Sequence, residues 1–285
     1  MKRCNWQIGS DPELFLYTPD GHFINAFEGF EKNLIKGTKA RPEPMPYGAI
    51  QVDGMAIEFN TVPTDSPLRF RNMIQAGMQD ACIRFGKAVA GQNSIAYFDQ
   101  TWLLSQHPAA IELGCDPDFN AWKHGEPNPR PDLENPCRTA GGHVHIGWRN
   151  PLEPIADVSA HVDECCAVIR HLDYALGVWS VPLDVNGTER RQMYGSAGAF
   201  RPKDYGVEYR VLSNFWIFKP TLSEDIVVRS LASMNAYADG LVLDQIFGDE
   251  ATKILKNDKT NLMSVLSEVN RLLDPYIEEV LRVAA

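Results

Sequence analysis

The sequence lacks the features that would assign it to several broad classes of protein. It contains no run near the roughly 20 apolar residues that a membrane-spanning helix needs, and residues 1–13 carry two cations but no apolar stretch, so we expect neither a membrane protein nor a secretory leader. It has no basic stripe of the kind that binds nucleic acid, and its net charge is −10. Its six cysteines show no CxxC spacing. We therefore expect reduced thiols, a cytoplasmic location and no nucleic-acid or membrane partner.

The familiar nucleotide-binding and hydrolase motifs are also missing. The chain has no GxxxxGK[ST] phosphate loop, no GxGxxG fingerprint after a strand and no GxSxG nucleophile elbow. Each of these motifs places backbone or a nucleophile where the chemistry needs it. Any nucleotide must therefore be held by another arrangement.

Turn residues and the spacing of apolar residues divide the 285-residue chain into strands and helices. Strands are expected at 14–17, 22–25, 49–60, 94–98, 110–114, 138–148 and 207–215, with a hairpin turn at Asp53-Gly54. Helices are expected at about 66–89, 154–180, 223–247 and 260–282, the last kinked or split by Pro275. Strands that come first, and then alternate with helices, predict an α+β fold with a largely antiparallel sheet. The last helix could pack on its own domain, which we prefer, or form the seam of a homo-oligomer.

Several expected strands place polar side chains on one face, because alternate residues of a strand point the same way. In HVHI, for example, His143 and His145 share a face, and in VEYR so do Glu208 and Arg210. The other such faces carry Asp11 with Glu13, and Glu58. A half-exposed sheet also alternates polar with apolar residues, but a solvated face usually carries lysine, and these carry none. Burying unpaired charge is costly, so we expect divalent cations and phosphates as counter-charges.

The residue types favour particular ions. Carboxylates with few thiols suit Mg²⁺ or Mn²⁺ better than zinc. The expected ligands are Glu13, Glu58 and Glu208, together with one of the two histidines; we take His143 as that ligand.

Residues 190–210 form a second constellation, in which four arginines lie among three glycines. The arginines are Arg190, Arg191, Arg201 and Arg210. The planar guanidinium matches phosphate or carboxylate bidentately, and glycine lets backbone approach a ligand. This pattern predicts a flexible arginine-bearing loop that serves phosphoryl transfer; the alternative is a surface loop held by salt bridges.

Taken in order, these segments resemble the carboxylate–amine ligases of the glutamine synthetase and glutamate–cysteine ligase superfamily, and in particular the phage-type branch of type 2 COOH–NH2 ligases. The matching pieces are GSDPELF, DGMAIEFN, CDPDFNAW, AGGHVHIG and RRQMYGSAGAFRPKDYGVEYRVLSNFW, which span residues 9–216. The resemblance implies a funnel-like, mainly antiparallel β-sheet with helices packed on the outside. It implies one catalytic domain over residues 1–285, with a motif-free helical region at 217–285, and the host cytoplasm as location if the gene belongs to a phage.

The same resemblance implies an activity and roles for residues. ATP would phosphorylate a carboxylate with the help of Mg²⁺ or Mn²⁺, and an amine would attack the acyl phosphate; amino acids, peptides or amines would be the substrates. Glu13, Glu58 and Glu208 match metal ligands, and Asp53 is a weaker candidate. His143 and His145 match contacts to metal or ATP, joined at the cofactor by Arg190, and Arg191, Arg201 and Arg210 match arginines that face phosphate or carboxylate. From the residues alone, the base for the amine is open among Asp11, Asp116 and Asp118, of which we name Asp11 as catalytic.

Two other functions remain open at this point. A pair of histidines with acidic residues can hold zinc and activate water, as in a metal-dependent hydrolase. A relative of the ligases could also bind nucleotide without catalysis.

Overall fold

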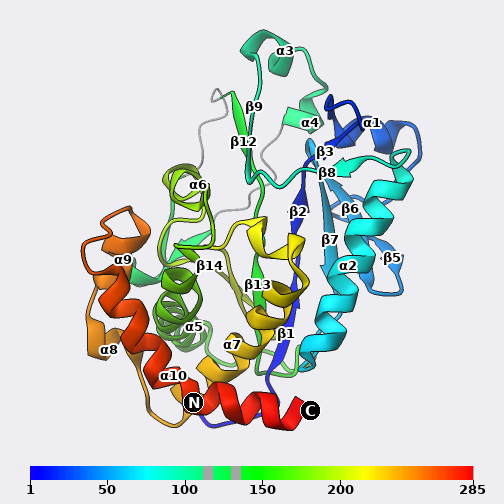
Figure 1. Ribbon diagram of the computed structural model, residues 1–285. Helices are drawn as coiled ribbons and strands as arrows, with labels where there is room; N and C mark the ends of the chain where they lie inside the picture. The colour runs from blue at the N-terminus through cyan, green and yellow to red at the C-terminus, as the bar shows by residue number, and fades with distance from the viewer. Residues whose placement is uncertain (112–117, 130–135, 285) are drawn as a thin grey trace.

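The computed structural model describes residues 1–111, 118–129 and 136–284 (Figure 1). Every strand pair in this part of the chain is antiparallel. Helices lie outside the two larger sheets. The expectation of an α+β fold with mainly antiparallel sheets and helices on the outside is confirmed.

The largest sheet has six strands in the order β1-β13-β15-β14-β10-β11. They are β1 (Gln7–Ser10), β13 (Val144–Gly147), β15 (Gly206–Tyr209), β14 (Ala199–Lys203), β10 (Phe119–Asn120) and β11 (Glu126–Pro127). Its central strands bury apolar residues on the helix side, among them Ile146, Val207 and Phe200. This leaves the opposite face of β13, β15 and β14 for the polar residues of the sequence motifs.

A second sheet has four strands in the order β2-β7-β6-β5. They are β2 (Glu13–Leu14), β7 (Ala56–Thr61), β6 (Gly48–Asp53) and β5 (Glu43–Met45). The expected hairpin turn joins β6 to β7, and Gly54 adopts φ 56° in it, a backbone conformation that glycine accepts without a steric penalty. The step Asp11-Pro12 carries the chain from β1 of the first sheet to β2 of the second. Asp11 is thus placed at the junction of the two sheets.

Two small sheets contain the remaining strands of the described residues. They consist of β12 (Cys137–Thr139) with β9 (Ile95–Tyr97), and of β4 (Phe23–Ile24), β3 (Leu16–Tyr17) and β8 (Val89–Ala90). The expected strand at 138–148 is therefore two strands, which belong to different sheets. The strand expected at 110–114 is wrong where the structure describes it, because its first two residues end helix α4 (Pro108–Ile111); the rest lies outside the described residues.

Long helices cover the sheets. Helix α2 (Pro67–Arg84) packs on β7 and begins as expected, with the Ser66 side chain accepting from the backbone N–H of Arg69. Helix α5 (Val158–Leu172) packs on β14 and β15 and continues into a π-helical segment, Asp173–Val178. The helix expected at 223–247 is divided into α7 (Pro220–Ala238) and α8 (Leu243–Phe247), because Gly240 adopts φ 95° between them. A residue in the left-handed conformation cannot continue an α-helix, so the helix ends there.

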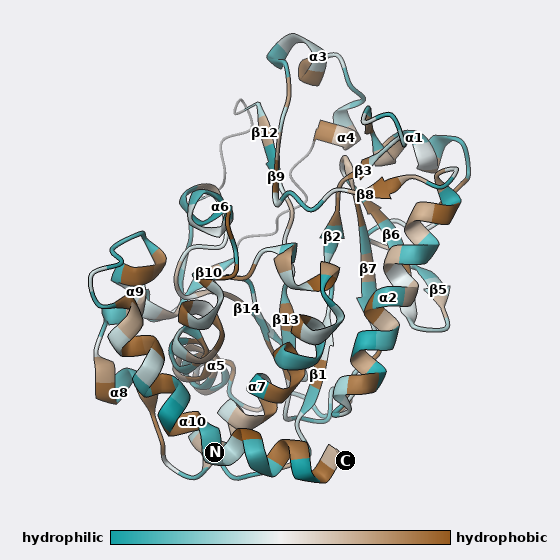
Figure 2. Cartoon of the chain, in the orientation of Figure 1, coloured by the Kyte–Doolittle hydropathy of each residue, from teal (hydrophilic) through white to brown (hydrophobic). Residues whose placement is uncertain are grey.

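The last long helix, α10 (Leu262–Ala284), contains Pro275 and changes direction along its length (Figure 1). It packs against α7 of its own chain, with Val269 and Leu273 fully buried. Figure 2 shows hydrophobic and hydrophilic residues alternating along α2 and α10, as expected of helices with one buried face. The apolar spacing of α10 is thus used for packing within the domain.

Shorter helices lie in the connections. They are α1 (Ala26–Glu31), α3 (Gln100–Leu104), α6 (Gly187–Met193), α9 (Glu250–Leu255) and the 3-10 turns at Ala121–Lys123 and Asn214–Phe218. Within the described residues no helix is both long and apolar enough to cross a bilayer.

Candidate active site

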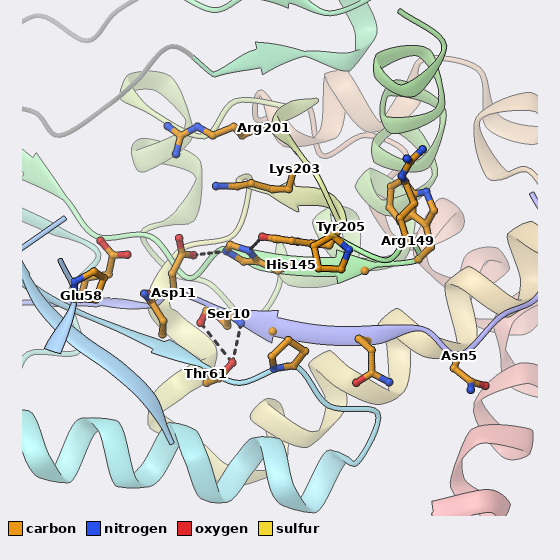
Figure 3. Close-up of a pocket in the computed structure, with 18 of the residues that line it drawn as sticks. Asn5, Ser10, Asp11, Glu58, Thr61, His145, Arg149, Arg201, Lys203 and Tyr205 are labelled. Atoms are coloured by element: carbon orange, nitrogen blue, oxygen red, sulfur yellow. Dashed lines mark hydrogen bonds and ion pairs between the residues drawn. The ribbon is translucent and has the colours of Figure 1, made fainter. Parts of the chain in front are cut away.

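A pocket of about 710 Å³ lies where the two larger sheets meet (Figure 3). Strands β1, β6, β7, β13 and β14 contribute to its lining. Asp11 and Glu58 lie at one end, and Arg201 and Lys203 extend toward that end from β14. The residues that line the pocket and matter for its chemistry are Asp11, Lys39, Glu58, His145, Arg201, Lys203 and Tyr205.

Three acidic residues of the four-stranded sheet form one cluster, here named the first acidic group: Glu13, Asp53 and Glu58. Glu13 and Glu58 are directly opposite each other on β2 and β7, and one oxygen from each of the three residues lies within 4.8 Å of the others. The Glu13 carboxylate also accepts a 2.7 Å hydrogen bond from the Gly141 backbone N–H. The cation placed here is Lys39, whose Nζ lies 3.0 Å from Oδ1 of Asp53.

The first acidic group carries more negative charge than its surroundings neutralise. Burial, followed by repulsion from Asp53, raises the pKa of Glu13 to about 7. Burial, with repulsion from Asp11, Asp53 and Glu13, likewise raises the pKa of Glu58 well above its usual value. Buried carboxylates behave in this way when they outnumber the positive charges beside them. The residues therefore fit a divalent cation, whose charge would offset this excess.

The second acidic group is Asp11, His145 and Glu208, whose ligand atoms also lie within 4.8 Å of one another. Nε2 of His145 lies 3.0 Å from Oδ1 of Asp11, and Nδ1 of His143 lies 3.3 Å from the same oxygen. His145, Glu208 and Arg201 are register partners across β13, β15 and β14. The shared face expected for the two histidines is thus confirmed, and Asp11 contacts both.

The two histidines differ in their surroundings. Burial and the nearby Arg210 guanidinium lower the pKa of His143 to about 3. Nδ1 of His145 is hydrogen-bonded to the Tyr205 hydroxyl, and its Nε2 points to the acidic residues. Burial alone would raise the pKa of Asp11, but the imidazoles beside it hold that pKa well below its usual range. His145, rather than the expected His143, belongs to the cluster with metal-ligand spacing.

Glu208 is fully buried and surrounded by cations. Its Oε2 lies 2.7 Å from Nζ of Lys203 and 3.6 Å from Nη1 of Arg201, and its Oε1 pairs with Arg210. Arg210 in turn donates to the Tyr194 hydroxyl. The second acidic group is therefore rich in positive charge, unlike the first.

The arginines of 190–210 do not form the flexible loop that the sequence suggested. Arg190 and Arg191 lie on helix α6, and Arg201 lies on strand β14. Arg190 is fully buried, donates to the Val211 carbonyl, and has its pKa lowered to about 10 by burial. Arg191 donates to the Leu255 carbonyl and lies 3.9 Å from Asp184. Arg191, expected in the catalytic set, is thus placed against the C-terminal region, because helix α6 turns it away from the pocket.

The polar strand faces singled out in the sequence carry no lysine, but two lysines from other segments, Lys39 and Lys203, line the pocket. Lys203 follows Arg201 by two residues on β14, so strand alternation could have placed it on the same face. Lys39 comes from an irregular segment, where no periodic signal exists. Tyr205 and Tyr194, which contact His145 and Arg210, were also missed.

The candidate bases separate in the structure. Asp11 and Glu13 were expected on one face of a strand. Pro12 instead lies between the end of β1 and the start of β2, so that Asp11 belongs to the second acidic group and Glu13 to the first. Asp118 lies 3.9 Å from Nε of Arg210, and burial raises its pKa. Asp116 lies outside the described residues.

Residues 137–275 match the family model described as "Phage phiEco32-like COOH.NH2 ligase-type 2". A solved structure described as "Crystal structure of novel glutamine synthase homolog" is similar, with 14% sequence identity over 99% of this chain and 68% of that chain and a TM-score of 0.39. No curated protein matches. Over residues 137–275, the family match confirms the resemblance of this chain to the phage-type COOH–NH2 ligases.

Proposed function

We propose that the protein is an ATP-dependent ligase that joins a carboxylate to an amine through an acyl phosphate. The observation that carries this proposal is the pairing of two acidic groups beside one pocket, one short of positive charge and one surrounded by it. Glu58 of the first group, and Asp11 and His145 of the second, line that pocket. Such a site suits a reaction in which two anions, a carboxylate and the terminal phosphate of ATP, must approach each other. The family match supports carboxylate–amine ligation, and the pocket chemistry supports the use of ATP.

Different residues of the site would bind the cations and neutralise the phosphate. Glu13, Asp53 and Glu58 would hold one divalent cation, and Asp11, His145 and Glu208 a second; Mg²⁺ or Mn²⁺ fits these oxygen-rich sets. A bound divalent cation would neutralise phosphate charge and polarise the bond that breaks. Arg201 and Arg210 would neutralise the equatorial oxygens as the phosphoryl group moves. Arg190 would act from behind Tyr194, whose ring lies 5.5 Å from its guanidinium carbon.

The amine must lose a proton before or as it attacks. Asp11 has a pKa held low by its imidazole neighbours, which makes it a weak base and suits it to orienting a cation or an ammonium group. Asp118 has a raised pKa and lies beside Arg210, so we assign it the base role. Amino acids, peptides or other amines are the substrate classes we propose.

Trapping with hydroxylamine tests the acyl phosphate directly. Purified protein would be incubated with ATP, Mg²⁺, a panel of carboxylic acids and hydroxylamine, and both hydroxamate and ADP would be measured. We expect equal amounts of the two, and only when an acid is present. Turnover without nucleotide, together with one tightly bound zinc per chain, would instead establish a zinc hydrolase. ATP binding without ADP formation for every acid would indicate a non-catalytic relative.

A further inference from the structure

We propose that Lys39 and Lys203 are exchangeable counter-cations: each holds one acidic group in the metal-free protein, leaves when a divalent cation enters, and then binds anionic oxygens in the pocket. The anionic oxygens would belong to the nucleotide, so this second step rests on the proposed function. The first step, exchange with a metal ion, does not.

The two acidic groups are each contacted by one lysine. Lys39 Nζ lies 3.0 Å from Oδ1 of Asp53 in the first group, and Lys203 Nζ lies 2.7 Å from Oε2 of Glu208 in the second. An ammonium and a divalent cation that contact the same small group of carboxylates repel each other, because like charges interact strongly at a few ångströms. We therefore expect metal binding at either group to drive its lysine away.

Both lysines have room to move. Their side chains are 45% and 28% exposed, although Glu208 itself is fully buried. A lysine carries its charge on a flexible four-carbon chain, whereas the guanidinium of Arg210 is planar and its side chain is buried. We therefore expect Arg210 to stay in place and the two lysines to leave.

The backbone at both positions is held by hydrogen bonds, so we expect only the side chains to swing. The Lys203 carbonyl accepts a 3.0 Å hydrogen bond from Nε2 of His161 on helix α5. Thr38 and Arg41, which flank Lys39, exchange two backbone hydrogen bonds. Both lysines line the same pocket, and Figure 3 shows Lys203 reaching toward its acidic end. A displaced ammonium would remain inside the pocket, where an anionic ligand would bind.

Mn²⁺ titration of variants tests the exchange without nucleotide. Lys39→Met and Lys203→Met would be compared with the wild type and with Lys36→Met, which removes an exposed charge from the segment that carries Lys39. Free Mn²⁺ would be followed by electron paramagnetic resonance. Removing a competing charge-assisted contact should tighten Mn²⁺ binding about tenfold, and Lys36→Met should leave it within about twofold. Equal or weaker binding in both pocket variants would overturn the proposal.

The second step is tested with a non-hydrolysable ATP analogue at saturating Mn²⁺. Lys39→Met and Lys203→Met should bind the analogue about tenfold more weakly, with no change in Lys36→Met. Tighter metal binding together with weaker nucleotide binding is a pattern that a purely structural lysine would not produce. Unchanged nucleotide affinity would overturn the second step. If the wild type binds no nucleotide, the ligase proposal fails, whereas the metal titration still decides the first step.

A crystal structure with Mn²⁺ gives an independent measurement on the unaltered chain. We expect Mn²⁺ in both acidic groups and each lysine Nζ beyond ion-pair distance of its former carboxylate. Mn²⁺ bound with both ion pairs intact would contradict the exchange, as would Mn²⁺ bound elsewhere only.

Discussion

The two acidic groups are neighbours but differ in how their buried negative charge is balanced. The first, Glu13, Asp53 and Glu58, has Lys39 as its nearby ion-pair partner and responds with raised pKa values. The second has Glu208 surrounded by Lys203, Arg201 and Arg210. The difference shows that carboxylates on a strand do not by themselves determine whether a site binds a cation or an anion. The neighbouring strands decide whether the site lacks positive charge or holds it ready for an anion.

Replacing Glu208 should have the largest effect. Glu208→Gln leaves three cations without their buried partner, and breaking a buried pair in this way costs about 3–5 kcal/mol of unfolding free energy. Turnover should fall by about 10³ because the cations lose their alignment on phosphate. Urea unfolding and ADP release would measure the two effects. A stable, active variant would remove Glu208 from the centre of the second group.

Replacing Glu58 should change metal binding but not metal-free stability. Burial and repulsion from Asp11, Asp53 and Glu13 raise the pKa of Glu58, so the neutral amide of Glu58→Gln relieves repulsion and breaks no attractive ion pair. We expect the free energy of unfolding to change by less than about 0.5 kcal/mol. Mn²⁺ affinity should fall at least about tenfold, since one ligand is lost. A stability loss as large as that of Glu208→Gln would show that the two groups do not differ as described.

The pH dependence of stability separates the groups further. Glu13 has a folded pKa of about 7 against an ordinary value of 4.5, so the stability linked to its protonated form is complete below pH 4.5 and is lost as pH rises through 7. We expect a loss of about 2–3 kcal/mol over this window without metal, and a smaller loss with Mg²⁺, because the cation favours the ionised acid.

Thermal melts between pH 5 and 8, with and without Mg²⁺, would measure this dependence. Glu13→Gln is the control and should remove the Mg²⁺-sensitive part. Asp173, a buried acid whose pKa burial also raises to about 7, would contribute a part that does not respond to Mg²⁺. A Mg²⁺-independent profile in the wild type would contradict a cation site at the first group.

Arg191→Met should have the smallest effect on turnover, because Arg191 points away from the pocket to the Leu255 carbonyl. We expect kcat within about twofold of the wild type, and a stability loss of about 1–3 kcal/mol from the lost hydrogen bond and the unpaired Asp184. Arg210→Met is the matched comparison and should lose most activity. Equal losses of turnover in the two variants would place Arg191 among the catalytic residues.

Much of the fold was predictable from local signals. The start of α2 at Ser66 and Pro67, the turn at Asp53-Gly54 and the shared face of His143 and His145 all follow from short-range chemistry. The errors fall where tertiary contacts override local pattern. The arginine segment became a helix and a strand, and the Pro12 step separated Asp11 from Glu13.

The sequence by itself determined which side chains share a face within an unbroken strand, as for His143 and His145, because strand alternation is a property of consecutive residues. It thereby determined that carboxylates, imidazoles and guanidiniums would meet in one place. Only the tertiary structure decided how they are grouped. The register between β13, β15 and β14 sets Glu208 between His145 and Arg201, and an irregular segment brings Lys39 to Asp53. These pairings join residues far apart in the chain, and the charge balance of each group depends on them.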